Sequence, residues 1–128
     1  MKGLLISAAL CLMLAGCGGE KQMETNSYTK ITAAEAKAMM DEQKDCVILD
    51  VRTQAEYDEG HIEEAVLIPD TEINDRAESE LPDKETVILL YCRSGRRSKL
   101  AAQALADMGY TNVYEFGGII DWPYEVVQ

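Results

Sequence analysis

The chain has 128 residues, enough for one domain. Its formal net charge is −11, with 12 basic and 23 acidic residues. So acidic a chain is a poor partner for nucleic acid, and we expect none to bind.

Residues 1–16 have the pattern of a secretory signal peptide rather than of a folded element. Lys2 provides a positive start, Leu4–Leu14 an apolar stretch, and small residues precede Cys17. The apolar stretch is too short for a comfortable transmembrane helix. The ending Leu14-Ala15-Gly16-Cys17 resembles the bacterial lipoprotein processing box. That resemblance implies that Cys17 becomes the first mature residue and carries a lipid.

A lipid on Cys17 would attach the protein to a membrane in the cell envelope. In a Gram-negative bacterium we expect the outer membrane, facing the periplasm, because no aspartate follows the cysteine. In other bacteria we expect the outer face of the cell membrane. An ordinary soluble secreted protein is the alternative.

The rest of the chain divides into a lipidated N-terminus with a polar tether, residues 17–30, and a domain, residues 31–128. Capping boxes mark helix starts and continuous apolar runs mark buried strands. The predicted elements are a helix from Thr32 to about Gln43, a strand Cys46–Leu49 that ends at Asp50, a short helix from Thr53 closed by Gly60, a strand Ala65–Ile68, one or two helical turns over 70–83, a strand Val87–Tyr91 that ends at Cys92, a helix Ser98–Met108 with Leu100 on its inner face and Gly109 as its cap, a strand Val113–Phe116 and a last turn Ile119–Trp122. Alternating strands and helices predict an α/β domain with a central, mainly parallel sheet flanked by helices.

Cys92 is the predicted nucleophile. It lies where a buried strand ends and a helix begins, which is the end of the strand where open α/β sheets bind ligands. A helix N-terminus and nearby cations favour a thiolate, and the loop supplies Arg93, Arg96 and Arg97. We therefore predict a local anion site and a thiol pKa below the value of about 8.5 for a free cysteine. The alternative is a structural cysteine beside arginines that only solvate a helix end.

Seven short motifs resemble those of the rhodanese domain in their order and spacing. They are Asp50-Val51-Arg52, Glu56-Tyr57, Gly60-His61-Ile62, Ile68-Pro69, Tyr91–Ser98, Gly117-Gly118 and Trp122. The resemblance covers about residues 31–124 and implies a rhodanese-like fold with the activity of a single-domain sulfurtransferase. One departure stands out: the family commonly has a glycine soon after Gly-His-Ile, where this chain has Glu63-Glu64.

What the resemblance implies is a persulfide mechanism. Cys92 would take the outer sulfur of a small anionic donor such as thiosulfate, hold it as Cys–S–S⁻, and pass it to a thiophilic acceptor, a protein acceptor included. The loop would bind the substrate through Arg93, Ser94, Gly95, Arg96, Arg97 and Ser98. No cofactor is expected, and no metal site either, because the cysteines and the single histidine are far apart in the sequence.

Two other functions are alternatives to sulfur transfer. Phosphatases built on a related domain use Cys-x₅-Arg, whereas here the sixth residue after Cys92 is Ser98 and Arg97 is the fifth. A shorter loop suits a sulfur atom better than a phosphoryl group, which argues against a phosphatase or arsenate reductase. A lipid-anchored sulfur carrier or sulfur sensor with little turnover remains open.

Four further residues have supporting or structural roles, and Asp50 and Arg52 are expected to support the site. Asp50, at the end of a strand expected beside that of the nucleophile, would either accept hydrogen bonds from the loop or cap its own next turn. Arg52 would pair with Glu56 four residues on, in a structural role. His61 would fix its loop rather than act as a general base, and Trp122 would lie in the core or border the pocket.

Overall fold

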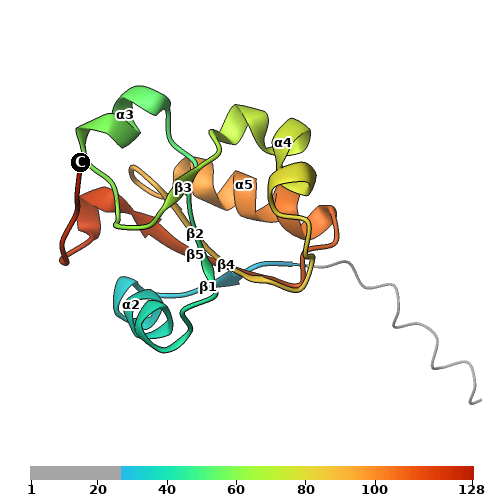
Figure 1. The fold of residues 1–128 in the computed structure, drawn as a ribbon, viewed down its shortest axis with the longest axis horizontal. Coiled ribbons are helices and arrows are strands. Elements are labelled where there is room, and N and C mark those ends of the chain that lie inside the picture. The colour runs from blue at the N-terminus through green and yellow to red at the C-terminus, as the bar shows by residue number, and fades with distance from the viewer. Residues whose placement is uncertain (1–26) are drawn as a thin grey trace, which may run out of the picture.

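The computed structural model describes residues 27–128, so the predicted signal peptide and Cys17 lie outside the described residues. The described chain forms a five-stranded, fully parallel sheet in the order β1-β5-β4-β2-β3 (Figure 1). The elements are β1 (Thr29–Lys30), α2 (Ala33–Glu42), β2 (Val47–Asp50), α3 (Gln54–Glu59), β3 (Val66–Leu67), the 3₁₀ turn η3 (Asp70–Glu72), α4 (Ile73–Glu80), β4 (Val87–Cys92), α5 (Arg96–Asp107), β5 (Asn112–Gly118) and the 3₁₀ turn η4 (Ile119–Asp121). The predicted α/β fold with a parallel sheet is confirmed.

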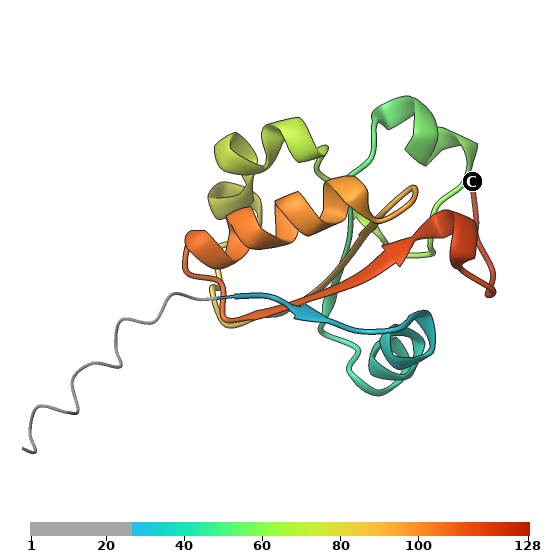
Figure 2. The same cartoon turned by 180° about the vertical axis from the view of Figure 1, so that it is seen from behind.

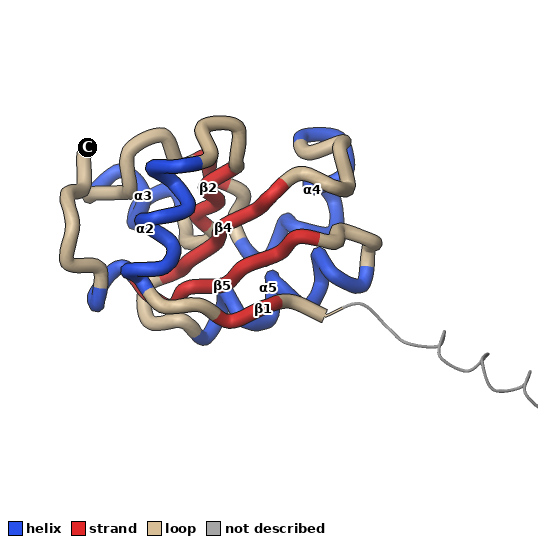
Figure 3. Tube along the Cα trace, turned by 90° about the horizontal axis from the view of Figure 1, so that it is seen from below, coloured by secondary structure: helices blue, strands red, loops and turns tan. Residues whose placement is uncertain are grey.

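Helices cover both faces of the sheet (Figures 1 and 2). Helix α2 packs on one face, and α4 and α5 pack on the other; Figure 3 shows α2 in front of the sheet from below. Alternate residues of β4 face the two layers, as the two-residue period of a strand requires. Leu90 and Cys92 belong to the α5 layer, and Leu89 and Tyr91 to the α2 layer. Cys92 therefore enters the α5 layer at the carboxyl end of a central strand.

Both predicted capping boxes are present. The side chains of Thr32 and Thr53 each accept a hydrogen bond from the backbone three residues on, at Glu35 and Glu56, whose carboxylates bond back to the cap. Each box satisfies two backbone donors that a helix start would otherwise leave without a partner. They start α2 and α3 where the sequence predicted.

Three boundaries differ from the prediction by two residues or more. Strand β5 runs on to Gly118 rather than ending at Phe116. Thr29 and Lys30, assigned to the tether, form β1, because their backbone pairs with β5 opposite Tyr114 and Glu115. Helix α5 begins at Arg96 rather than Ser98.

The inner face of α5 also differs from the prediction. Its buried stripe consists of Ser98, Ala101, Ala102, Leu105 and Ala106. With Ser98 turned inward, the helical period of 3.6 residues turns the position two residues on toward solvent. The prediction that Leu100 packs inward is therefore wrong, and its side chain is 68% exposed.

The two described cysteines lie at opposite ends of the sheet. Val47 pairs with Ile88 and Asp50 with Tyr91 in parallel register, so Cys46 sits five residues below the level of Cys92. At a rise of about 3.3 Å per residue this offset is roughly 16 Å, well beyond the roughly 7 Å limit for a disulfide. Neither cysteine is in a disulfide.

The turn that carries Glu63-Glu64 explains why the family prefers glycine nearby. Glu64 has a φ of 72°, and the turn closes with a bond from the Ala65 N–H to the Ile62 carbonyl. A left-handed backbone is costly for any residue with a Cβ. Glu64 therefore keeps a strained conformation that glycine would adopt freely.

We predict that Glu64→Gly raises the free energy of unfolding by roughly 0.5–1 kcal/mol, because it relieves this strain. Urea titration at pH 7 measures the change. Glu63→Gly, one residue earlier, should give no gain, since among the described non-glycine residues only Glu64 has a positive φ. Equal stabilisation by both substitutions would contradict the strain argument.

Candidate active site

Cys92 ends β4, and the chain turns through a short loop into α5. The turn requires Gly95, whose φ of 103° favours a residue without a Cβ. The Gly95 N–H points back into the loop and donates to the Cys92 sulfur at 3.0 Å. Cys92 is fully buried, so its sulfur lies at the floor of the loop rather than on its surface.

The pKa of Cys92 reflects two opposed effects. Burial raises it, because a thiolate loses its hydration. Hydrogen bonds lower it: Ser98 contributes its hydroxyl and its N–H, and Gly95 and Ser94 contribute N–H groups. The result is a thiol pKa below the ordinary value, which confirms the predicted direction.

The arginines play a smaller part in this shift than expected. Arg93 and Arg96 are exposed, and Arg97 makes a two-pronged ion pair with Glu56 on α3, at 2.9 and 3.0 Å. That pair lowers the pKa of Glu56 to about 2, mainly through the hydrogen bonds from Arg97. Hydrogen bonds from the Ser98 hydroxyl and from the backbone of the loop, rather than guanidinium charge, are the main support for an anionic sulfur.

The loop folds closely over the end of β5. A Cβ on Gly118 would overlap the Arg93 carbonyl, and that carbonyl accepts a hydrogen bond from the Ile120 N–H at 3.2 Å. Gly117 has a φ of 97°. The Gly-Gly pair therefore allows β5 to support the loop from below.

A buried carboxylate that sequence analysis did not single out lies beneath the loop. Glu115 of β5 is fully buried and accepts hydrogen bonds from Ser98 Oγ at 2.5 Å and the Gly117 N–H at 2.9 Å. Lys30 Nζ lies 3.1 Å from its other oxygen. The available signal was a charged residue within an otherwise apolar strand segment, one position after Tyr114 and before Phe116.

On the other face, Asp50 and Arg52 form a buried ion pair. The Arg52 side chain donates to both Asp50 oxygens, and the Arg52 N–H also donates to Oδ1. The predicted pairing of Arg52 with Glu56 is therefore wrong: Arg52 folds back on its own strand end, while Arg97 takes Glu56. Asp50 has the capping role, and it accepts a further bond, at 2.7 Å, from the hydroxyl of Tyr91. Burial raises the pKa of that hydroxyl.

His61 lies in a structural setting. Its ring stacks on Tyr57 with centroids 3.7 Å apart, and Nδ1 lies 2.9 Å from the Tyr57 carbonyl oxygen. Its backbone pairs with Val127 near the C-terminus. These contacts fit the expected role in fixing the loop.

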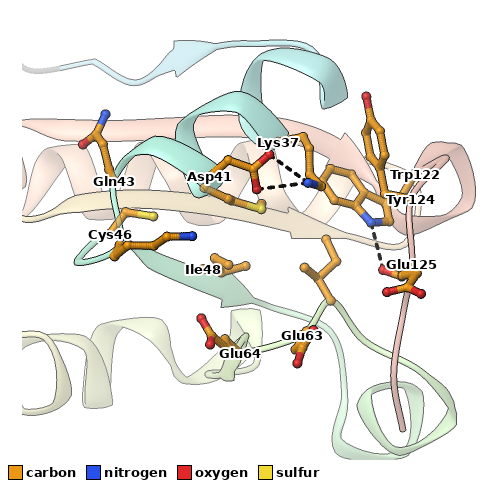
Figure 4. Close-up of a pocket in the computed structure, with 13 residues that line it drawn as sticks. Lys37, Asp41, Gln43, Cys46, Ile48, Glu63, Glu64, Trp122, Tyr124 and Glu125 are labelled. Atoms are coloured by element: carbon orange, nitrogen blue, oxygen red, sulfur yellow. Dashed lines mark hydrogen bonds and ion pairs between the residues drawn. The ribbon is translucent and has the colours of Figure 1, made fainter.

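Two hollows lie near these elements. One, of about 270 Å³, adjoins the Cys92 loop and is lined by Arg93, Arg52 and Ile120, among others. The other, of about 490 Å³, lies in the α2 layer, on the opposite side of the sheet from the Cys92 side chain (Figure 4). Trp122 borders this second cavity, and its ring centroid lies 5.3 Å from that of Phe116; it does not line the smaller hollow at Arg93.

A comparison with known protein families shows which family the chain belongs to. Residues 32–123 match the model of the rhodanese-like domain. The chain belongs to the rhodanese family. The resemblance of the domain to the rhodanese family is confirmed.

Individual relatives agree with this assignment. Thiosulfate sulfurtransferase PspE of Escherichia coli is 38% identical over 73 residues, which cover 57% of this chain and 70% of that protein. The putative sulfur carrier protein YrkF of Bacillus subtilis is 36% identical over 107 residues, which cover 82% of this chain and 57% of that protein. A solved structure described as a rhodanese with anions from E. coli superposes with a TM-score of 0.60 at 35% identity and covers 64% of this chain and 96% of the other. The family and these relatives support rhodanese-type sulfur transfer.

The Glu56–Arg97 pair should make stability depend on pH. Because folding lowers the pKa of Glu56 from 4.5 to about 2, the pair stabilises the fold above about pH 4.5 and loses this effect as the pH falls toward 2. Glu56→Gln keeps a capping-box residue but removes the charge. We predict a loss of about 1–2 kcal/mol at pH 7, moderate because both side chains are about a quarter exposed.

Urea unfolding of both proteins at pH 7 and near pH 2 tests this prediction. The difference should fade at the lower pH, while the exposed control Glu42→Gln should match the wild type at both. A difference that stays constant across the range would contradict the assignment of the charge pair.

Proposed function

We propose that the protein transfers sulfane sulfur through a persulfide on Cys92. The thiolate attacks the outer sulfur of thiosulfate, the S–S bond breaks, and sulfite leaves with the bonding electrons. The product is Cys–S–S⁻. An acceptor such as cyanide then attacks the outer sulfur, thiocyanate leaves, and the thiolate is restored. No net proton is consumed in either step.

The observation that carries this proposal is the group of donors around one sulfur. The Ser98 hydroxyl and the N–H groups of Ser98, Gly95 and Ser94 stabilise negative charge at Cys92 although burial opposes it. A helix N-terminus adds positive potential at the same place. Such fixed donors suit a site where an anion forms and is released in each cycle.

The geometry also favours a small donor. The sulfur lies at the floor of a tight loop, so only a narrow group that presents a single sulfur can approach it. The exposed Arg93 borders the adjoining hollow, where a sulfonate-type anion would meet a cation. These features support thiosulfate or a similar anionic donor over a bulky one.

A sulfur carrier that passes sulfur to a protein acceptor is the second candidate, favoured by the similarity to YrkF. A carrier would also form the persulfide but would turn over slowly with cyanide. Intact mass after incubation with thiosulfate, polysulfide and arylsulfonyl thiol donors, together with the rate of thiocyanate formation, separates the two candidates.

Cys92→Ser should lower thiosulfate-to-cyanide transfer by on the order of 1,000-fold or more, because the hydroxyl is a poor nucleophile without a base. The mass of one added sulfur atom should also disappear. Cys46→Ser is the matched control and should retain most activity, since Cys46 lies at the far end of the sheet. Equal losses in both variants at equal folded fraction would overturn the assignment of Cys92.

We further propose that the mature chain is held at a membrane by a lipid on Cys17. The support is the sequence pattern of residues 1–17. Within residues 27–128, no helix is long and apolar enough to cross a bilayer.

In cells that express the full chain, Cys17→Ala should move most of the protein from the membrane fraction to the soluble fraction. The physical reason is the loss of acyl chains, each CH₂ of which contributes about 0.8 kcal/mol to membrane binding. Cys46→Ser serves as the control and should stay with the membranes. Unchanged membrane association of Cys17→Ala would refute lipidation at that residue.

A further inference from the structure

Glu115 is a buried carboxylate for which the sulfur-transfer mechanism has no role. It lies in β5 opposite Leu90 of β4, on the α5 side of the sheet, where Cys92 also points. A buried charge is costly unless it is fully partnered. Here three donors meet it: Lys30 Nζ, the Gly117 N–H and the hydroxyl of Ser98. A carboxylate accepts hydrogen bonds only, so this set is matched to its ionised form.

The Ser98 hydroxyl has several acceptors within reach. It donates to Glu115 at 2.5 Å, the Gly95 and Gly117 carbonyl oxygens lie farther away at 3.2 and 3.4 Å, and its hydrogen bond is also the first of the causes that lower the pKa of Cys92. A hydroxyl has one proton. When that proton lies on the carboxylate, the Cys92 sulfur receives hydrogen bonds from backbone N–H groups alone. The short, charge-assisted bond to Glu115 is the stronger competitor.

We propose that Glu115 is a positioning residue for the sulfur-transfer site: its carboxylate orients the Ser98 hydroxyl and so sets how many hydrogen bonds the Cys92 sulfur receives. This inference rests on the proposed function. In the persulfide, the negative charge sits on the outer sulfur, and the hydroxyl remains with Glu115.

The competition for the Ser98 proton affects how reactive Cys92 is during sulfur transfer. A thiolate that is stabilised too strongly is a weaker nucleophile, because nucleophilicity falls with the pKa of the thiol. By withholding one donor, Glu115 keeps the sulfur of Cys92 reactive while the backbone still keeps it ionised. Ser98 passes the influence of β5 to the nucleophile.

Other charged groups surround the loop. Each of the variants described below changes only the residue that it names and leaves the remaining charged groups in place. They are the Arg97–Glu56 pair between α5 and α3, Asp70 of η3, which acts on Arg97, the exposed Arg93, Arg96 and Lys99, Lys30 of β1 and the Asp50–Arg52 pair on the opposite face. Their common contribution cancels when two variants are compared in the same background.

The test is the rate of iodoacetamide alkylation of Cys92 against pH, in a Cys46→Ser background of the full chain. Glu115→Gln keeps the shape of the side chain but replaces a charged hydrogen-bond acceptor by a neutral one. The midpoint should fall by roughly 0.5–1 pH unit, because a neutral acceptor competes less strongly than a carboxylate with the thiolate for the hydroxyl proton. Glu42→Gln removes the same charge at an exposed site and should leave the midpoint unchanged.

A double-mutant cycle isolates the path through Ser98. Ser98→Ala alone should raise the midpoint or leave it in place, and in this background Glu115→Gln should shift it by less than half as much as in the wild type. An absent shift, a rise, or an undiminished shift without the hydroxyl would overturn the proposal.

Lys30→Met provides a second perturbation if Glu115→Gln fails to fold, because the Lys30 side chain is 57% exposed. Loss of the ammonium leaves the carboxylate with a stronger hold on the Ser98 proton. Lys30→Met should raise the alkylation midpoint when Ser98 is present and should raise it less in a Ser98→Ala background. Equal rises in the two backgrounds would overturn the proposal. Alkylation does not require sulfur transfer, so an absent persulfide mass with thiosulfate would refute the proposed function alone.

Discussion

The site depends on one conflict: a sulfur that must ionise is buried completely. Burial opposes the thiolate, and distant surface charge is too well screened to reverse this. The loop resolves the conflict with fixed donors from its own backbone, among them the Gly95 N–H at 3.0 Å. These donors need no reorganisation when the charge forms, which is the condition for electrostatic stabilisation of an intermediate.

That loop can close only because β5 gives it room. Gly118 lets the strand touch the Arg93 carbonyl, and Gly95 supplies the left-handed turn that directs its N–H to the sulfur. Bulk at either position would push the loop away from Cys92. The glycines are therefore part of the anion site even though they contribute no functional group.

Buried charges flank the carboxyl end of the sheet on both faces. Asp50 and Arg52 lie in the α2 layer, and Glu115 with its ammonium partner Lys30 lies at the α5 layer. Each buried carboxylate is expensive to bury, and both oxygens of each have hydrogen-bond partners. Such departures from an apolar core are expected where a fold holds a reactive group.

The sequence by itself determined the local features. The apolar runs, the two threonine capping boxes and the strand-to-helix position of Cys92 follow from neighbouring residues, and the structure confirms them. The tertiary structure decided the partners: Glu56 pairs with Arg97 from another element, and Glu115 reaches Ser98 across 17 positions. Pairing rules along one helix cannot anticipate such contacts, because they depend on which strand ends meet at the edge of the folded sheet.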